Sequence, residues 1–477
     1  MDTRSKHTVE KIGGTSMSRA HELRDRLFMR EGKAEYGRIF VVSAFGGITN
    51  LLLEHKKTGQ PGVYGRFANA DGDTGWQAAL DEVADAMRQA HRAVLDDGAD
   101  IAAADAFVAE RTHGARSCLV DLQRLCSYGH FRLSDHMLII REMLSGLGEA
   151  HSTFATVLML QRAGVNARFI DLSGWRDEEQ HDLDSRITSA LEGVDVTSEM
   201  PIVTGYAQCL EGLMREFDRG YSEVTFSRLA ALTGAAEAII HKEFHLSSAD
   251  PNLVGAGAVR KLGHTNYDVA DQLSNLGMEA IHPKAAKTLR QAEVPLRVTN
   301  AFEPGDPGTL IDDAPAEKPA VEIVTGLEVK AIELFEQDMV GVKGYDAAFL
   351  DVLTRHGVRI VSKASNANTI THYVEASLKT VRRVEKDLAR LYPSADVSLR
   401  SMALASAVGR DLGGQRVLAR GLAALEAADC EVLAAQQPSR AVDVQFLVPR
   451  DRLDAAIAAL HGALVEDGKE GRPKLVA

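Results

Sequence analysis

Apolar residues in the first part of the chain form short continuous runs that alternate with segments of helical spacing. The run at 38–43 is apolar almost throughout, which is typical of a parallel strand covered on both faces. Similar short runs occur at 167–171, 200–204 and 295–299. Strands that alternate with helices in this way predict an open, mainly parallel α/β sheet, with ligands at the carboxyl ends of its strands.

Helices are predicted between these strands wherever apolar residues recur at helical spacing. Residues 76–125 predict a helical insertion with no chemistry of its own. Shorter helices are predicted at 18–29, 133–143 and 154–161, and the last two are separated by a predicted glycine turn at 145–149.

The turn after the first strand holds Lys11, Gly13, Gly14, Thr15 and Ser16. Two glycines that adopt φ > 0 let backbone N–H groups approach an anion closely. The two hydroxyl residues are predicted to cap the helix that follows. A phosphate cradle and an ordinary strand-to-helix turn with a solvated lysine both fit this spacing.

Two further segments carry polar residues next to predicted strand ends. A second glycine turn at 43–50 holds Ser43 and Thr49. Farther along, Arg219, Ser222 and Glu223 lie just before or within the first turn of a helix predicted from residue 224. This segment predicts an anion site with a carboxylate alongside.

Two histidines, His241 and His245, are four residues apart. In the zinc-protease order a glutamate follows the first histidine directly, whereas here Glu243 lies midway between them. The surrounding residues also read as strand and then loop, so we expect no metal site at this pair.

The chain changes character beyond the polar segment 303–319, which carries four prolines. An order of helices and paired strands then occurs twice, with helices at 345–356, 379–391, 415–428 and 450–464 and strands within 358–375, 430–435 and 441–448. This repeat predicts two small ferredoxin-like α+β modules that sense a ligand or drive assembly. The predicted boundaries are 1–310 for the α/β domain, 311–320 for a linker, and 321–395 and 396–477 for the two modules.

Composition narrows the classes of function. The 477 residues carry a formal net charge of −13 without a dense basic run, which argues against a nucleic-acid partner. No apolar run is long enough to cross a membrane, and the first residues are too polar for a signal peptide. The four cysteines are scattered, as expected for reduced thiols of a cytoplasmic protein.

Taken together, these turns resemble those of aspartate kinases, within the amino acid kinase family, over nearly the whole chain. The resemblance rests on the segments 11–16, 41–50, 148–149, 219–223, 249–251 and 267–283, which occur in the family's order. It implies a three-layer αβα kinase domain followed by two ACT domains. It also implies transfer of the γ-phosphoryl group of ATP, with Mg²⁺, to the β-carboxylate of L-aspartate.

The resemblance also implies roles for individual residues. Lys11, with Glu223 nearby, would act on the transferring phosphoryl group, and Arg219 and Glu149 would hold the carboxylate and ammonium of the substrate. The remaining nucleotide contacts would come from Gly13, Gly14, Thr15, Lys242, Ser247 and Asn252. The remaining substrate contacts would come from Ser43, Thr49 and Ser222.

The chain departs from the family pattern at several of these positions. Tyr221 and Glu223 stand where the family has Gly and Asp, and His241 with Lys242 stands where it has Thr-Asp. Ser247 and Glu279 replace a family Tyr and Lys. These departures resemble a divergent branch associated with ectoine synthesis, and they predict a remodelled nucleotide pocket.

Two other functions stay open at this point. The chain could be a catalytically silent amino-acid sensor, or a kinase that acts on another acceptor such as glutamate. In the modules, an amino-acid effector would bind near 339–344 and 365–368. Alternatively, the modules only build the interface of a homo-oligomer.

Overall fold

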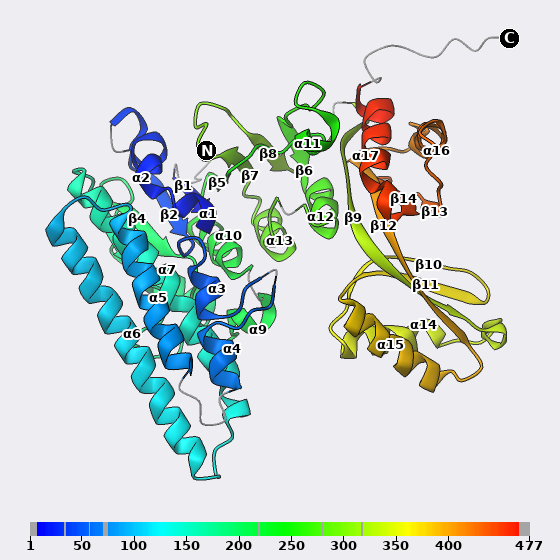
Figure 1. The fold of residues 1–477 in the computed structure, drawn as a ribbon. Coiled ribbons are helices and arrows are strands. Elements are labelled where there is room, and N and C mark those ends of the chain that lie inside the picture. The colour runs from blue at the N-terminus through cyan, green and yellow to red at the C-terminus, as the bar shows by residue number, and fades with distance from the viewer. Residues whose placement is uncertain are drawn as a thin grey trace. The chain divides into compact units, whose positions relative to one another are not determined.

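The computed structural model describes residues 7–32, 35–56, 58–69, 75–217, 220–278, 280–315 and 318–466. The chain divides into two compact units (Figure 1). The first contains Met1–His245 and Ile281–Asp312, and the second contains Leu246–Ala280 and Asp313–Ala477. The second unit therefore includes a segment that lies, in sequence, inside the first.

The first unit is built on one twisted sheet with the strand order β3-β4-β2-β1-β5-β7-β8. Its strands are β1 (Thr8–Ile12), β2 (Arg38–Val42), β3 (Ala167–Ile170), β4 (Met200–Thr204), β5 (Glu237–Lys242), β7 (Leu296–Asn300) and β8 (Thr309–Asp312). All neighbouring pairs are parallel except β7 and β8. The predicted, mainly parallel α/β sheet is confirmed, and it extends by β8 into the segment that we expected to be only polar.

Helices surround this sheet. They are α1 (Gly14–Met17), α2 (Ala20–Leu23), α3 (Ile48–Leu52), α4 (Val63–Ala68), α5 (Gly75–Arg92), α6 (Gly98–Ser127), α7 (Met137–Arg162), α8 (Leu183–Ala190), α9 (Leu213–Phe217), α10 (Tyr221–Thr233) and α13 (Pro283–Gln291). The long helices α5 and α6 correspond to the predicted helical insertion. None of the described helices combines the length and apolarity that crossing a bilayer requires.

Two local predictions were wrong. The glycine turn expected at 145–149 lies inside α7, which continues without interruption. Gly146 and Gly148 serve packing rather than turning, because a Cβ on either would come within 3.0 Å of Tyr206 or Ala44. The helix expected at 18–29 is also interrupted: α2 is followed by a π-helical turn at Arg24–Phe28.

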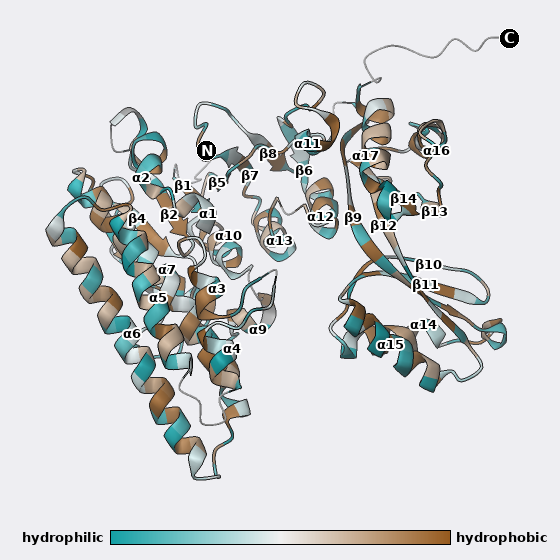
Figure 2. Cartoon of the chain, viewed as in Figure 1, coloured by the Kyte–Doolittle hydropathy of each residue, from teal (hydrophilic) through white to brown (hydrophobic). Residues whose placement is uncertain are grey.

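The second unit contains a six-stranded sheet with the order β10-β11-β9-β12-β14-β13. Its strands are β9 (Ala320–Phe335), β10 (Arg359–Ser365), β11 (Thr369–Glu375), β12 (Asp396–Arg410), β13 (Ala434–Gln436) and β14 (Asp443–Pro449). Its main helices are α14 (Tyr345–Arg355), α15 (Leu378–Leu391), α16 (Val417–Ala427) and α17 (Leu453–His461). Figure 2 shows teal and brown alternating along α15, whose buried side chains are Val381, Val384 and Leu388.

Two hydrophobic cores divide this sheet into ferredoxin-like halves. One core gathers around Phe349 and Val381, and the other around Phe446 and Leu460. The long strands β9 and β12 pair antiparallel along most of their length and contribute residues to both cores. The predicted α+β modules are confirmed as a fold class, and the two halves share these two strands.

The segment Leu246–Ala280 completes the second core. It contains α11 (Pro251–Val254), β6 (His264–Asn266) and α12 (Tyr267–Asn275). Ala249 is fully buried in the core around Phe446. Ser248 contacts His461 with 2.8 Å between Oγ and Nε2, and its carbonyl accepts a hydrogen bond from the Val324 amide at 2.8 Å.

Candidate active site

Three predicted site residues meet at the carboxyl-terminal edge of the first unit's sheet. Lys11 lies near the end of β1, Lys242 ends β5, and Glu223 lies in the first turn of α10. The Nζ atom of Lys11 is 3.5 Å from Oε1 of Glu223, and Nζ of Lys242 is 3.7 Å from the same oxygen. Parallel strands end at the same edge, so residues far apart in sequence converge there.

The carboxylate of Glu223 is also held by the backbone, because the amide of His282 donates to its Oε2 at 2.5 Å. Burial alone would raise the pKa of Glu223. The positive charges of Lys11 and Lys242, together with the His282 amide, outweigh burial and hold that pKa below its ordinary value. Glu223 is therefore a carboxylate that stays ionised between two ammonium groups.

Glu149 lies on α7 and has the opposite electrostatic character. Its Oε1 accepts a hydrogen bond from the Ser222 hydroxyl at 2.8 Å, whereas Oε2 is buried with no hydrogen-bond partner among the described residues. Burial raises the pKa of Glu149 to about 8, against the opposing effects of the Ser222 hydrogen bond, the charge of Lys11 and the backbone amides of Tyr206 and Ala44. An orphaned, buried carboxylate oxygen is suited to a cationic ligand group.

The two glycine turns pack against each other, and the backbone of the first turn differs from the conformation that we predicted. Gly13 has φ −74° and caps α1 without a side-chain hydrogen bond, so the predicted positive φ and the predicted caps at Thr15 and Ser16 were wrong. Both hydroxyl residues lie inside α1. Gly14 is required by close approach, since a Cβ there would come within 2.6 Å of the Ala44 carbonyl oxygen.

The remaining residues of these turns have local partners. Ser16 is buried and donates to Glu243 at 2.5 Å. Ser43 follows β2, and its carbonyl accepts from the Ser152 hydroxyl of α7 at 2.9 Å. Thr49 lies in the first turn of α3 and is half-buried, while Thr15 is exposed.

Not all of the predicted site residues can be assigned to this edge. Ser247 and Asn252 belong to the second unit. There Ser247 donates to the Ala249 carbonyl at 2.9 Å, and the Asn252 amide donates to Asp250 at 2.8 Å. The predicted Arg219, and Glu279 among the noted departures, lie outside the described residues.

A buried network beneath this edge was missed by the sequence analysis. Arg38 binds Glu10 through two hydrogen bonds of 2.7 Å, and His241 Nε2 lies 2.7 Å from the same carboxylate. Thr299 Oγ1 lies 2.7 Å from His241 Nδ1, so the network crosses β2, β1, β5 and β7. Glu10 and Lys11 are adjacent on a strand and therefore point to opposite faces. The signal in the sequence was a charged residue in each of two strands, Glu10 within β1 and Arg38 at the start of β2.

His241 and His245 have separate surroundings, because His241 is engaged by Glu10 and Thr299. Nε2 of His245 lies 3.0 Å from Glu303, and Nδ1 lies 3.6 Å from Asp306. The two nitrogens of the His245 ring therefore face two different carboxylates.

Comparison with known proteins decides the family. The amino acid kinase family matches residues 6–300. The chain is 52% identical to the aspartate kinase Ask_Ect of Stutzerimonas stutzeri (strain A1501), over 98% of this chain and 98% of that one. The chain belongs to the aspartate kinases of the amino acid kinase family. It is also 22% identical to chloroplastic aspartokinase 1 of Arabidopsis thaliana, over 96% of this chain and 80% of the relative.

Solved structures agree with this aspartate kinase in fold. Aspartokinase III of E. coli, in complex with lysine and aspartate, matches with a TM-score of 0.69 and 18% identity. The match covers 96% of this chain and 99% of that one. The same enzyme in complex with aspartate and ADP also gives a TM-score of 0.69, at 19% identity. At such identities the likeness concerns the fold, and the site of this aspartate kinase must be argued from its own residues.

Proposed function

We propose that the chain transfers the γ-phosphoryl group of ATP to the β-carboxylate of L-aspartate, giving 4-phospho-L-aspartate and ADP. The observation that carries the proposal is the pair of ammonium groups, Lys11 and Lys242, around Glu223, together with the buried carboxylate of Glu149, which lies within the electrostatic reach of Lys11. The lysines suit a polyanionic donor, and the carboxylate suits an amino-acid acceptor.

The acceptor would be oriented by its charged groups. The ammonium of L-aspartate satisfies Oε2 of Glu149, whose Oε1 is already fixed by Ser222. Arg219 takes a substrate carboxylate through its planar fork, and Ser43 and Thr49 complete the edges of the pocket. The nucleophile is already a carboxylate, so the reaction needs no general base and depends on positioning and charge stabilisation.

The phosphoryl donor would meet both lysines. A carboxylate oxygen of aspartate attacks the γ-phosphorus, the bond from that phosphorus to the β–γ bridging oxygen breaks, and ADP leaves. Lys11 and Lys242 stabilise the charge on the transferring group, with the amides of Gly13 and Gly14 and with Thr15 alongside. Glu223 holds both ammonium groups in place, which makes it a positioning residue between phosphate-binding cations. Ser247 and Asn252 remain proposed nucleotide contacts.

The donor set also indicates how Mg²⁺ would be held. Both oxygens of Glu223 are occupied by lysine ammonium groups and a backbone amide, so this carboxylate is not a ready metal ligand. Mg²⁺ would then bind mainly through the phosphate oxygens of ATP and through water, as it commonly does in kinases. Its contribution would be to neutralise phosphate charge.

The rest of the chain would serve regulation and assembly. We assign the kinase domain to 1–310, a linker to 311–320, and ACT-type modules to 321–395 and 396–477. The modules bind an amino-acid effector near 339–344 and 365–368, or they join two chains in a homo-oligomer. The enzyme would act in the cytoplasm. The similarity to Ask_Ect supports a place in the branch that feeds ectoine synthesis.

The test is ADP release from ATP, Mg²⁺ and L-aspartate, with L-glutamate as the competing acceptor. The expected result is turnover with aspartate at least about tenfold faster than with glutamate at equal concentration. Equal rates would point to a broader amino acid kinase. No turnover above the Lys11→Ala variant, with no ATP binding by calorimetry, would overturn the proposal and favour a silent sensor.

A further inference from the structure

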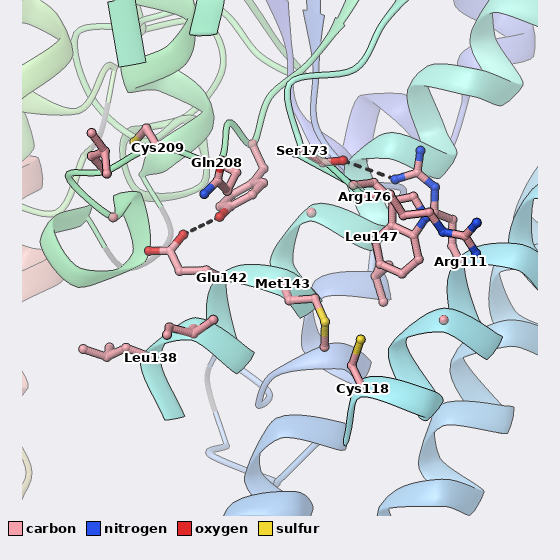
Figure 3. Close-up of a pocket in the computed structure, with 18 of the residues that line it drawn as sticks. Arg111, Cys118, Leu138, Glu142, Met143, Leu147, Ser173, Arg176, Gln208 and Cys209 are labelled. Carbon is pink, nitrogen blue, oxygen red and sulfur yellow. Dashed lines mark hydrogen bonds between the residues drawn. The ribbon is translucent and has the colours of Figure 1, made fainter. Parts of the chain in front are cut away.

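A second cavity of the first unit lies between α6, α7 and the loops that follow β3 and β4 (Figure 3). Its volume is about 620 Å³, which is in the usual range for small-molecule pockets. The residues described along its walls do not include Lys11, Glu149 or Glu223. The cavity is therefore distinct from the proposed phosphoryl-transfer site.

Two helices supply facing walls of this cavity. On α6, Arg111, Gly114 and Cys118 recur at helical spacing and share one face. On α7, residues spaced by four form two adjacent rows, which are Leu138, Glu142 and Gly146, and Ile139, Met143 and Leu147. Figure 3 shows Cys118 on one helix opposite Met143 on the other. Most of these walls are apolar.

Two aromatic rings that line the cavity pack against glycines of α6 and α7. A Cβ on Gly114 would come within 2.5 Å of the Trp175 ring, and one on Gly146 would come within 3.0 Å of the Tyr206 ring. Both rings therefore pack directly against the helix backbone, where a side chain larger than that of glycine would displace them. The cavity therefore has preformed walls rather than a loose gap between helices.

Most polar groups deep in the walls already have partners in the protein. Glu142 accepts hydrogen bonds from the Tyr206 hydroxyl at 2.5 Å and from the Met214 amide at 2.7 Å. Arg111 donates to Asp171 at 2.6 Å and to Ser173 at 3.2 Å. The buried Nε of Arg111 donates no hydrogen bond among the described residues and lies 3.4 Å from Oε2 of Glu110. A ligand in this cavity gains little from hydrogen bonds to these groups, so its body must be mainly apolar.

The rim of the cavity adds a preference for negative charge. Among the described lining residues three are arginines, Arg111, Arg176 and Arg215, against one carboxylate, Glu142. The side chain of Arg176 is 72% exposed and pairs with Glu110 at 3.0 Å. Exposed pairs of this kind are weak, so a ligand carboxylate can exchange for Glu110. In Figure 3, Arg111 and Arg176 lie on the side of the cavity away from Glu142.

We infer that this cavity binds a small, mainly apolar carboxylic acid that has no ammonium group beside the carboxylate. An α-amino acid fits less well, because its ammonium would sit next to the same guanidinium that attracts its carboxylate. A neutral molecule of the same shape would fill the walls but would gain nothing from Arg176.

Displacement of a fluorescent probe from the full-length protein tests the charge preference. The probe is 8-anilino-1-naphthalenesulfonate, and the competitors are 4-phenylbutyrate, 4-phenyl-1-butanol and phenylalanine. The acid is expected to displace the probe at about tenfold lower concentration than the other two, a difference that one ionic contact can supply. Arg176→Asn should remove that advantage, and asparagine tolerates the backbone φ of +58° at this position. Equal potency of acid and alcohol would overturn the inference.

Alkylation of Cys118 locates the bound molecule. This thiol is exposed and lines the cavity, whereas Cys209 and Cys430 are buried, and Cys126 is removed by Cys126→Ser. Saturating 4-phenylbutyrate is expected to slow iodoacetamide labelling of Cys118 at least about fivefold, as burial of a thiol lowers its reactivity. Cys118→Trp, which narrows the cavity, should abolish displacement by the acid while the melting temperature stays unchanged. Unprotected Cys118, or unchanged binding by a folded Cys118→Trp, would place the acid elsewhere and overturn the inference.

Discussion

The ammonium group of Lys11 lies 3.5 Å from the carboxylate of Glu223, with both side chains almost completely buried. Removing one member of a buried pair leaves the other charge uncompensated. Glu223 is compensated twice, however, because Lys242 reaches the same oxygen. The site can therefore lose one lysine and still keep Glu223 ionised.

Replacement of Lys11 tests its contact with the transferring phosphoryl group. Lys11→Ala should lower kcat by roughly 100- to 1,000-fold, because a preorganised charge at the reacting group is lost. Since Lys242 still pairs with Glu223, the protein should remain folded. The measurement is steady-state ADP release, with Lys56→Ala as the matched control at an exposed lysine of the same unit. Equal activity of the two variants would contradict the assignment.

Replacement of Lys242 tests the remodelled nucleotide pocket. Lys242→Ala should raise KM for ATP by about tenfold and leave KM for aspartate nearly unchanged, since this lysine is assigned to the donor side. Lys242→Arg keeps the charge and should recover most of the loss. A larger change in KM for aspartate than for ATP would move Lys242 to the acceptor side of the site.

The affinity for aspartate should depend on pH through Glu149. Its pKa is raised to about 8 by burial, so it is mostly protonated at pH 7 and gains negative charge as the pH rises. The substrate ammonium binds the ionised form, so KM for aspartate should fall by roughly fivefold to tenfold between pH 7 and 8.5. KM for ATP serves as the internal control. The Glu149→Gln variant should bind aspartate weakly and without this pH dependence, and a parallel trend in both proteins would exclude Glu149 as its source.

The same raised pKa predicts an effect on stability. The folded-state pKa of Glu149 lies above its unfolded value of 4.5, so the folded protein holds its proton more tightly. The contribution of Glu149 to the unfolding free energy is fully present below pH 4.5 and is lost as the pH rises through about 8. Glu149→Gln cannot ionise and should melt at a higher temperature than the native protein at pH 8.5, with the difference vanishing near pH 4.5. Thermal unfolding at the two pH values measures this, and an unchanged difference would contradict it.

The buried pair of Glu10 and Arg38 should dominate the stability of the first unit. Glu10→Gln leaves the Arg38 guanidinium buried without its counter-charge, and should cost about 3–5 kcal/mol of unfolding free energy. The matched control is Glu22→Gln, which removes an exposed partner of Arg19 and should not change the melting temperature measurably. Both variants are compared by denaturant unfolding at pH 7, and equal effects would contradict the role of burial.

Low pH should weaken the ion pair of Glu10 and Arg38, because protonation removes the charge of Glu10. Arg38 and His241 hold the pKa of Glu10 far below its ordinary value, against the opposing effect of burial. A depressed folded-state pKa gives stability that is present above the unfolded value of 4.5 and is lost as the pH falls. The difference in unfolding free energy between the native protein and Glu10→Gln should therefore become smaller as the pH falls below 4.5. Denaturant unfolding at a series of pH values would measure this.

The apolar pattern and the glycine turns were enough to predict most of the elements and most of the candidate residues. Continuous apolar runs predicted the strands of the parallel sheet, because a strand buried on both faces has no polar face to display. Glycine turns after two of these strands indicated Lys11, Ser43 and Thr49 as neighbours of a ligand. The same signals failed at Ser145–Glu149, where Gly146 and Gly148 lie in mid-helix because side chains of neighbouring segments, such as Tyr206 and Ala44, approach the helix closely.

Which of these residues act together depends on how the strands and helices pack, and no local pattern in the sequence shows it. More than two hundred positions separate Lys11 from Lys242 in the sequence. Their ammonium groups approach the same oxygen of Glu223 because β1 and β5 are paired, parallel neighbours in the sheet. The orphaned oxygen of Glu149 and the network through Glu10 are likewise properties of burial, which no local pattern encodes. Local propensity sets where an element begins and ends, while packing sets which charges must share a site and what their pKa values become.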